Sequence, residues 1–234
     1  MCIFDDQLSD TFEAVAGDSP YNAYVDRPSN LELIGDCAGQ RVLDLGSGAG
    51  HYAAELAERG AQVDGVEGSQ RLIEHATRRL APHLGTRVTL RRHDLESPLD
   101  FVESASYDGV LVALVYHHVT ARGQLLDELF RVLRPGGWLV LSTTHPTADW
   151  ALFGGSYDDE SRIARTRGNS AGIRYWRQTL QGLITELLAP GFVLERLVEP
   201  RPVPELEAID PERFTKLRNE PCFLGVRLRR PAAS

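Results

Sequence analysis

A short apolar run that ends in one acid and three glycines constrains this chain more than any other feature. Residues 42–50 read VLDLGSGAG, so Asp44 stands inside the run, and Gly46, Gly48 and Gly50 alternate with small residues. Glycine accepts backbone angles that other residues avoid, so this segment predicts a tight turn after a buried strand. It also predicts that a ligand comes very close to the backbone at that turn.

Apolar runs of strand length alternate with amphipathic segments along nearly the whole chain. This alternation predicts an α/β protein with one mostly parallel sheet and helices on both faces. Strands are predicted at residues 41–45, 62–66, 88–92, 109–114, 138–143, 192–197 and 222–228. Helices are predicted at residues 51–59, from an N-cap at Ser69 to Leu80, at 124–133 and at 179–188.

Two stretches do not fit the alternation, but its extent favours a single domain. Residues 1–40 are predicted to form a helical lid before the central core of residues 41–144. Residues 145–175 are predicted to be an insertion beside the ligand site, rich in aromatic residues. Residues 176–234 then supply the last helix and strands.

Composition restricts the partners of this chain. The net charge of −8 argues against nucleic acid, which needs a basic face. No apolar run reaches membrane-spanning length and the N-terminus is acidic, so we expect neither an anchor nor a signal peptide, which favours a cytoplasmic location. Cys2, Cys37 and Cys222 lack metal-ligand spacing, so we expect reduced thiols and no metal site.

Two ligand classes fit a glycine turn that leads into a helix N-terminus. A dinucleotide needs a third glycine where this chain has His51, and its pyrophosphate would be repelled by Asp44. A zwitterionic amino-acid nucleoside with a positive charge tolerates Asp44 and offers a carboxylate to the turn. Glu67, at the end of the next strand, suits a ribose diol. Asp94 and Leu95 suit an adenine amino group and ring.

At this point the motifs resemble the class I S-adenosylmethionine-dependent methyltransferases in order and spacing. They are VLDLGSGAG, the strand ending at Glu67, HDL, YDGVLVALVYHHV and ELFRVLRPGGWLVLS, together covering residues 41–143, while YNAYVDRPSN is similar to one bacterial branch acting on small molecules. The resemblance implies a Rossmann-like sheet of seven strands whose last strand is antiparallel. It implies S-adenosyl-L-methionine as the cofactor. The cofactor-binding residues that we predict are Tyr21, Tyr24, Asp44, Gly46, Ser47, Gly48, Glu67, Gly68, Ser69, Leu72, Asp94, Leu95, Ala113 and Leu114.

One departure from that branch concerns the acceptor. Many relatives carry a His-Arg-Pro-Leu-like segment before the penultimate helix, where this chain has Tyr-Trp-Arg-Gln-Thr-Leu at residues 175–180. The acceptor of those relatives is therefore not assumed here. No Asn-Pro-Pro-aromatic segment follows the fourth strand. That segment is typical of relatives that methylate exocyclic amines of bases or amides, so its absence from this sequence disfavours those acceptors.

Histidines at strand ends are the candidate catalytic residues, because a histidine can remove a proton from a hydroxyl or amine acceptor. We predict that His117 or His145 acts there, and the resemblance suggests that His118 is structural. We also predict that Trp150, Tyr157 and Trp176 contact the acceptor, with a small aromatic core of the insertion as the alternative.

The leading hypothesis is methyl transfer to an oxygen, nitrogen or carbon atom of a small organic molecule. The alternatives are a cofactor-binding protein without transfer activity and a nicotinamide oxidoreductase. We expect no membrane or nucleic-acid partner, and the sequence leaves monomer and homodimer open.

Overall fold

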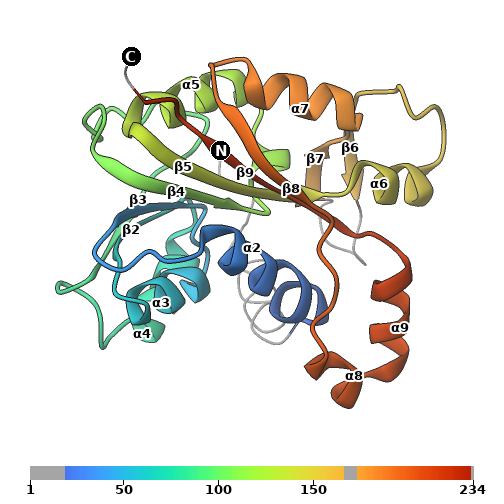
Figure 1. The fold of residues 1–234 in the computed structure, drawn as a ribbon, viewed down its shortest axis with the longest axis horizontal. Helices are drawn as coiled ribbons and strands as arrows, with labels where there is room; N and C mark the ends of the chain where they lie inside the picture. The colour runs from blue at the N-terminus through green and yellow to red at the C-terminus, as the bar shows by residue number, and fades with distance from the viewer. Residues whose placement is uncertain (1–18, 166–172, 233–234) are drawn as a thin grey trace.

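The computed structural model describes residues 19–165 and 173–232, which build a seven-stranded sheet and a two-stranded hairpin (Figure 1). The large sheet has the order β3-β2-β1-β4-β5-β9-β8. Its strands are β1 (Arg41–Leu45), β2 (Gln62–Glu67), β3 (Val88–Arg92), β4 (Tyr107–Ala113), β5 (Leu133–Thr144), β8 (Val193–Val198) and β9 (Phe223–Arg229).

The strand pairing confirms the predicted mostly parallel sheet. The pairs β1–β2, β2–β3, β1–β4 and β4–β5 are parallel, whereas β9 runs antiparallel to both β5 and β8. The chain order reverses between β1 and β4. Connections leave those two strands in opposite directions, so a crevice forms beyond their carboxyl ends.

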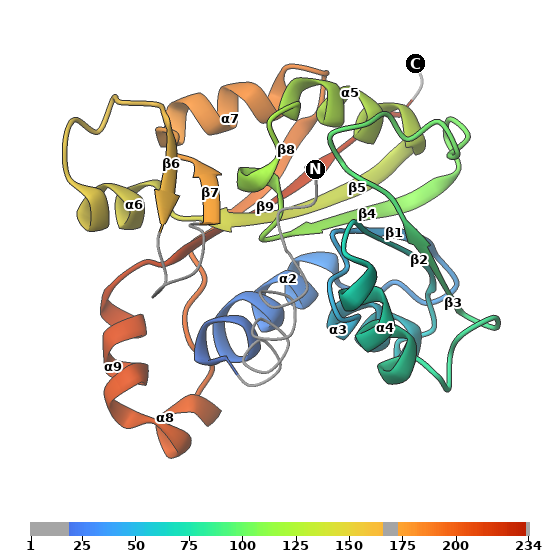
Figure 2. The same ribbon diagram turned by 180° about the vertical axis from the view of Figure 1, so that it is seen from behind.

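Helices cover both faces of the sheet, as the alternation of apolar runs predicts (Figures 1 and 2). The helices α2 (Arg27–Ile34), α3 (His51–Glu58) and α4 (Gln70–Arg79) lie on one face. The helices α5 (Arg122–Val132) and α7 (Leu180–Leu188) lie on the other. Each face has its own apolar core. The core under α2, α3 and α4 includes Leu56 and Leu80, and the core under α5 and α7 includes Leu129 and Leu187. Within residues 19–165 and 173–232, no helix is both long and apolar enough to cross a bilayer.

Local signals explain why most element boundaries agree with the prediction. The Ser69 hydroxyl accepts a hydrogen bond from Leu72 N–H, and the Thr179 hydroxyl accepts one from Gly182 N–H, so both act as N-caps. Strand β5 is the exception, because it starts at Leu133 and not at residue 138. Its early part pairs with Tyr107 across a register shift that a hydrophobic pattern does not reveal.

The segments outside the alternation adopt specific structures. Of the predicted lid, residues 22–34 form the π-helix η1 (Asn22–Asp26) and α2, and residues 1–18 lie outside the described part. The insertion contains α6 (Pro146–Phe153) and strands β6 (Arg162–Arg165) and β7 (Ile173–Trp176), of which β7 ends one residue beyond the predicted boundary.

Two helices before the last strand were missed by the sequence analysis. They are α8 (Glu205–Ile209) and α9 (Pro211–Asn219), which pack with η1 around Val25, Leu206 and Phe214. The start of α9 carries a readable signal. Asp210 accepts a hydrogen bond from Arg213 N–H, and Pro211 occupies the first helical position.

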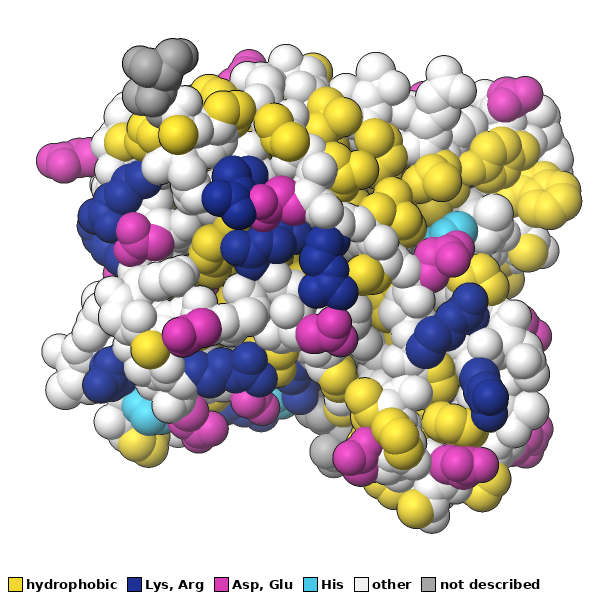
Figure 3. Space-filling view, viewed as in Figure 1, with side chains coloured by type: hydrophobic (Ala, Val, Ile, Leu, Met, Phe, Trp, Pro, Cys, Tyr) yellow, Lys and Arg dark blue, Asp and Glu magenta, His cyan; other side chains and the backbone are white. Residues whose placement is uncertain are grey.

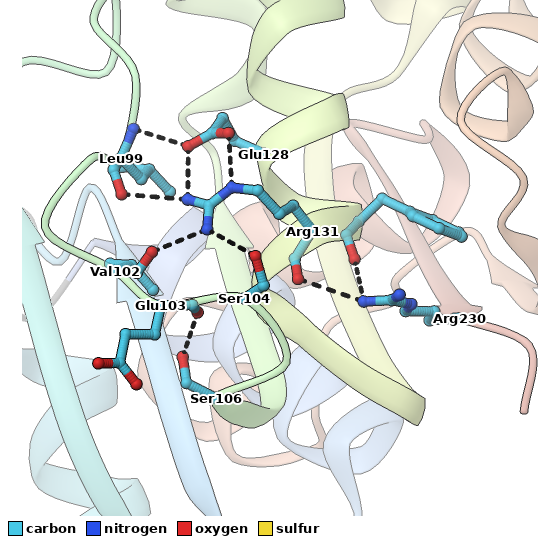
Figure 4. Close-up of polar contacts among 9 residues, drawn as sticks. Leu99, Val102, Glu103, Ser104, Ser106, Glu128, Arg131 and Arg230 are labelled. Carbon is cyan, nitrogen blue, oxygen red and sulfur yellow. Dashed lines mark hydrogen bonds and ion pairs between the residues drawn. The ribbon is translucent and has the colours of Figure 1, made fainter. Parts of the chain in front are cut away.

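One half-buried arginine, Arg131, fixes the long connection between β3 and β4 (Figure 4). The Arg131 guanidinium donates to the carbonyl oxygens of Leu99 and Val102 and pairs with Glu128, whose carboxylate also accepts from Leu99 N–H. Arg230 donates to carbonyl oxygens at the end of α5, including that of Phe130. These contacts hold the loop that leads from the third strand into the centre of the sheet.

Candidate active site

The turn between β1 and α3 carries three glycines with positive φ. A Cβ on Gly46 would lie 2.3 Å from the Val115 side chain, so packing alone requires glycine there. A Cβ on Gly48 would meet no atom of the described residues closer than 4.0 Å, and Gly48 lines a cavity. Among the described residues, the absence of a side chain at Gly48 therefore leaves room for a ligand.

A cavity of about 320 Å³ lies at the crevice between β1 and β4, a size typical of small-molecule sites. The turn, the ends of β2, β4 and β5, the loop after β3, η1 and the start of β9 all contribute to its lining. Ten of the predicted cofactor-binding residues are among those that line it: Gly46, Ser47, Gly48, Glu67, Gly68, Leu72, Asp94, Leu95, Ala113 and Leu114.

Asp44 lies buried in β1 immediately before the glycine turn, with 1% of its surface exposed. Its Oδ2 has no hydrogen-bond partner among the described residues. Burial, together with the nearby Glu67 carboxylate, raises the pKa of Asp44 to about 7. A buried acid without a hydrogen-bond partner among the described residues is costly, so its position beside the glycine turn suits a ligand that carries a positive charge.

Glu67 holds the turn in shape from the end of β2. Its carboxylate accepts hydrogen bonds from Gly48 N–H at 3.0 Å and from Ser69 N–H at 2.8 Å. Burial raises the pKa of Glu67, although these N–H groups oppose the rise. A carboxylate oxygen accepts more than one hydrogen bond, so Glu67 still has capacity for a ligand diol.

The loop after β3 is tied to the loop before α5 by one side chain. Glu96 accepts hydrogen bonds from Thr120 N–H at 2.8 Å and from Ala121 N–H at 3.0 Å. Its own N–H donates to Asp94 Oδ1. Asp94 and Leu95 therefore occupy a loop that is anchored to the segment bearing His117 and His118.

A buried polar network on the lid side of the cavity was not predicted from the sequence. Tyr52 O–H donates to Asp26 Oδ2 at 2.6 Å, and Asn30 Nδ2 lies within hydrogen-bond distance of Asp26, Tyr52 and Ser142. Burial raises the pKa of Asp26 to about 6 against the effect of these hydrogen bonds.

This network leaves opposite charges beside the cavity. Asp26 and Arg27 both line it. Asp26 Oδ1 and Arg27 Nε are buried and lack a hydrogen-bond partner in residues 19–165 and 173–232. A neighbouring acid and base with unused polar atoms suit the ammonium and carboxylate of an amino acid.

The histidine pair after β4 lies at the cavity. His117 and His118 both line it, and their ring centroids are 4.1 Å apart. His117 Nδ1 lies 3.0 Å from Thr143 Oγ1. Burial, and the neighbouring His118, hold the pKa of His117 well below its ordinary value, so the ring is neutral. His118, which the resemblance suggests is structural, lines the cavity as well, and its role stays a prediction.

His145 does not reach the cavity lining. Its Nδ1 accepts a hydrogen bond from Thr147 N–H, which makes it the N-cap of α6. Its Nε2 lies 3.0 Å from Glu199 Oε1. Burial lowers the pKa of His145, although Glu199 opposes this. The structure therefore gives His145 contacts within the protein at both ring nitrogens.

The predicted acceptor-contacting aromatic residues also lie outside the cavity lining. Trp150 is 45% exposed and donates to Gly155 O, so it is not part of an insertion core either. Tyr157 O–H accepts from Leu180 N–H. The Arg122 guanidinium lies over the Trp176 ring at 4.7 Å.

Four predicted cofactor-binding residues are likewise absent from the lining. Asp44 lies beneath the turn, and Ser69 caps α4. Tyr21 packs edge-on against Phe223, which itself lines the cavity, and Tyr24 packs in the cluster with Val25. Their binding roles stay predictions.

The strand order, the bare turn after β1 and the acids at the ends of β1 and β2 together define the class I S-adenosylmethionine-dependent methyltransferase fold. Residues 43–141 match the family model described as "Methyltransferase domain". Residues 43–141 are therefore similar to a methyltransferase domain, and the chain has the fold of the class I enzymes.

Known proteins agree with that assignment. A demethylmenaquinone methyltransferase of Clavibacter sepedonicus is 35% identical over 116 residues, which cover 49% of this chain and 45% of the relative. A ubiquinone biosynthesis O-methyltransferase of Leptothrix cholodnii is 32% identical over 112 residues, covering 48% and 47%. The match thus spans about half the length of these curated relatives.

Structural likeness extends further along the chain. A crystal structure described as a putative S-adenosylmethionine-dependent methyltransferase from Listeria monocytogenes superposes with a TM-score of 0.76. It covers 88% of this chain and 96% of that one at 24% identity. The likeness establishes the fold for most of the chain.

Proposed function

We propose that this protein transfers a methyl group from S-adenosyl-L-methionine to a small organic acceptor. The observation that carries the proposal is the buried Asp44, whose Oδ2 has no hydrogen-bond partner in residues 19–165 and 173–232, close to the open Gly48 position. An acid at this place repels a pyrophosphate and attracts a cationic nucleoside. The nicotinamide alternative is therefore disfavoured.

The residues at the cavity fit each part of the cofactor. Glu67 has acceptor capacity for the ribose, and Asp94 and Leu95 suit the adenine. Asp26 and Arg27 offer opposite charges to the amino-acid end. When bound, S-adenosyl-L-methionine supplies a methyl group already activated on a sulfonium.

The protein's own contribution is placement and exclusion of water. Glu96 connects the loop that bears Asp94 to the residues just after His117 and His118. These hydrogen bonds fix the position of the two loops relative to each other. Precise placement of two reactants lowers the barrier of a displacement without any further chemical group.

A small acceptor is favoured by the size of the cavity, about 320 Å³. The names of two relatives, a demethylmenaquinone methyltransferase and a ubiquinone biosynthesis O-methyltransferase, support an organic acceptor. On the face shown in Figure 3, basic and acidic side chains are interspersed, which favours no nucleic-acid partner. We propose that the protein binds neither nucleic acid nor a membrane. We also propose that it is a monomer or a homodimer.

We also propose a bacterial source and a cytoplasmic location. The bacterial relatives support the first. Free thiols at Cys37 and Cys222 support the second, because they suit a reducing compartment.

Thermal unfolding with S-adenosylhomocysteine or NAD tests the cofactor assignment, because a ligand that binds the folded state raises Tm. We expect a rise with S-adenosylhomocysteine alone; a rise with NAD alone would contradict the proposal. Incubation with methyl-labelled cofactor and a metabolite panel then tests transfer. Cofactor binding with no labelled product from any acceptor would favour the non-catalytic alternative.

A further inference from the structure

A π turn lies inside the helix that faces the cavity from the lid side. Helical residues run without a break from the start of η1 to the end of α2. Arg27 N–H donates to the carbonyl oxygen of Asn22, five residues earlier, whereas an α-helix would bond it to Ala23. π turns are rare and lie frequently at functional sites. The turn therefore indicates a function for this part of the chain.

Pro28 explains why the turn lies at this place. It is the second residue of α2 and stands inside the continuous helical segment. Proline has no N–H, and in an α-helix its ring would clash with the carbonyl group four residues earlier, which is that of Tyr24. The wider turn avoids this clash, and Tyr24 O accepts a hydrogen bond from Val203 N–H at 2.9 Å instead.

The π turn places three polar residues at the cavity. Asn22, Asp26 and Arg27 all line it. In an α-helix, Arg27 would lie about 140° around the axis from Asn22, because each residue turns the helix by about 100°. The hydrogen bond from Arg27 to Asn22 shows instead that the two residues are one turn apart on the same side. One extra residue in the turn thus brings an amide next to an acid and a base.

These residues retain polar atoms without hydrogen bonds. Asp26 Oδ1 and Arg27 Nε are buried and have no partner in residues 19–165 and 173–232. The half-buried Asn22 makes no side-chain hydrogen bond within the same ranges. An amide can donate to a carboxylate and accept from an ammonium group. The three side chains therefore suit a zwitterion, which carries both charges.

The sheet order indicates which end of a ligand the π turn would meet. The helix is tied to β5, because Asn30 Nδ2 lies 3.0 Å from Ser142 Oγ. Asp94 follows β3, and four strand spacings, about 19 Å in all, separate β3 from β5. An adenine held at Asp94 therefore leaves the other end of the cofactor on the side of the π turn.

We infer that Pro28 shapes the π turn so that Asn22 binds the amino-acid end of S-adenosyl-L-methionine. Pro28 is then a positioning residue, because it lies outside the cavity lining and acts through the turn. Asn22 is a specificity-determining residue that recognises the zwitterion beside Asp26 and Arg27. This inference rests on the proposed function.

Calorimetry with two probes tests the role of Asn22. S-adenosylhomocysteine carries the amino-acid end, whereas 5′-methylthioadenosine has the same adenosine and thioether without it. Asn22→Ala should weaken binding of S-adenosylhomocysteine by about tenfold and change that of 5′-methylthioadenosine by less than about twofold. Equal weakening of both probes, or of neither, would overturn the role of Asn22.

Replacement of the proline tests the turn itself. In Pro28→Ala the helix can take the α-helical register, so Arg27 N–H should donate to Ala23 O. NMR couplings across hydrogen bonds measure this change without a ligand. The variant should lose affinity for S-adenosylhomocysteine by about tenfold and keep its affinity for 5′-methylthioadenosine. Pro211→Ala is the matched control, because Pro211 occupies the first turn of α9, where its missing N–H costs nothing, and should leave both affinities unchanged.

The outcomes separate this inference from the proposed function. An Arg27 hydrogen bond that stays with Asn22 in Pro28→Ala would overturn the role of the proline. A shifted hydrogen bond with unchanged affinity for S-adenosylhomocysteine would overturn the role of the turn. A wild-type protein that binds neither probe would contradict the proposed cofactor itself.

Discussion

Replacing Asp44 with asparagine should stabilise the protein and weaken its cofactor binding. Burial and the Glu67 carboxylate raise the pKa of Asp44 from 3.8 to about 7. At ~1.4 kcal/mol for each tenfold change in proton affinity, ionised Asp44 costs the folded state about 4 kcal/mol. Asparagine has nearly the same shape and no charge, so it should recover most of that free energy.

The sign of the pH dependence follows from linkage. The folded state holds the Asp44 proton more tightly than the unfolded state, so the wild-type protein loses stability as the pH rises from 3.8 to about 7. The Asp44→Asn protein lacks this loss. Its advantage in unfolding free energy should be about 4 kcal/mol near pH 8 and nearly absent near pH 4.

Urea unfolding of both proteins across this pH range measures the difference. Asp64→Asn is a control of opposite sign. Burial raises the pKa of Asp64, but hydrogen bonds from Thr89, Tyr107 and Arg41 outweigh burial and hold it below the ordinary value. Removing that carboxylate should therefore destabilise the protein at neutral pH, and the loss should shrink in acid.

Calorimetry with S-adenosyl-L-methionine gives the functional half of the result. Asp44→Asn should weaken binding by at least about tenfold, because the cation loses its nearest buried acid. If Asp44→Asn were no more stable than wild type at pH 8, or if its advantage persisted unchanged at pH 4, the argument from the buried charge would be wrong.

Three further substitutions probe other parts of the site. Gly48→Ala should weaken S-adenosylhomocysteine binding by about tenfold in calorimetry. Gly39 is the control, because it also has a positive φ and open space around a Cβ. Both variants should lose about 1 kcal/mol of unfolding free energy, but Gly39→Ala should keep its affinity. The sequence alone predicts that His145→Ala lowers turnover. In the structure, His145 contacts Thr147 and Glu199, so we expect His145→Ala to leave turnover unchanged. It should lower the unfolding free energy by about 1 kcal/mol, because the N-cap of α6 is lost. Trp150→Ala should change stability by no more than about 0.5 kcal/mol and leave the acceptor KM unchanged, because its side chain is 45% exposed outside the cavity lining; a higher KM would restore the predicted acceptor contact.

The sequence could predict most of the residues that line the cavity at the glycine turn, because their signals are local. Asp44 and the glycine turn are contiguous, and Glu67 ends the next strand, so parallel pairing alone brings them to one edge. The helix starts at Ser69 and Thr179 were equally local, since each cap lies within three residues of its partner N–H.

The rest of the candidate site depends on contacts that no local pattern records. Asp26, Tyr52 and Ser142 come from three elements and meet only in the folded chain. His145 follows β5 at the predicted edge of the sheet, yet its ring turns to Glu199 and away from the cavity lining. Which way a side chain points after a strand depends on register and on the next helix, neither of which a histidine in sequence reveals.

The charges around the cavity show why this site is built at a cost in stability. Burial and the Glu67 carboxylate raise the pKa of Asp44 to about 7, and burial raises that of Asp26 to about 6 against its hydrogen bonds. For Asp64 in β2, hydrogen bonds from Thr89, Tyr107 and Arg41 outweigh burial and hold the pKa below its ordinary value. Stability alone would favour a neutral side chain at both buried positions. Both acids are instead placed where one ligand with ammonium and sulfonium charges would relieve them together. Binding of such a ligand would remove the destabilisation that the two buried charges cause in the folded state. This gain would strengthen binding of the cation and discriminate against ligands that lack its charge.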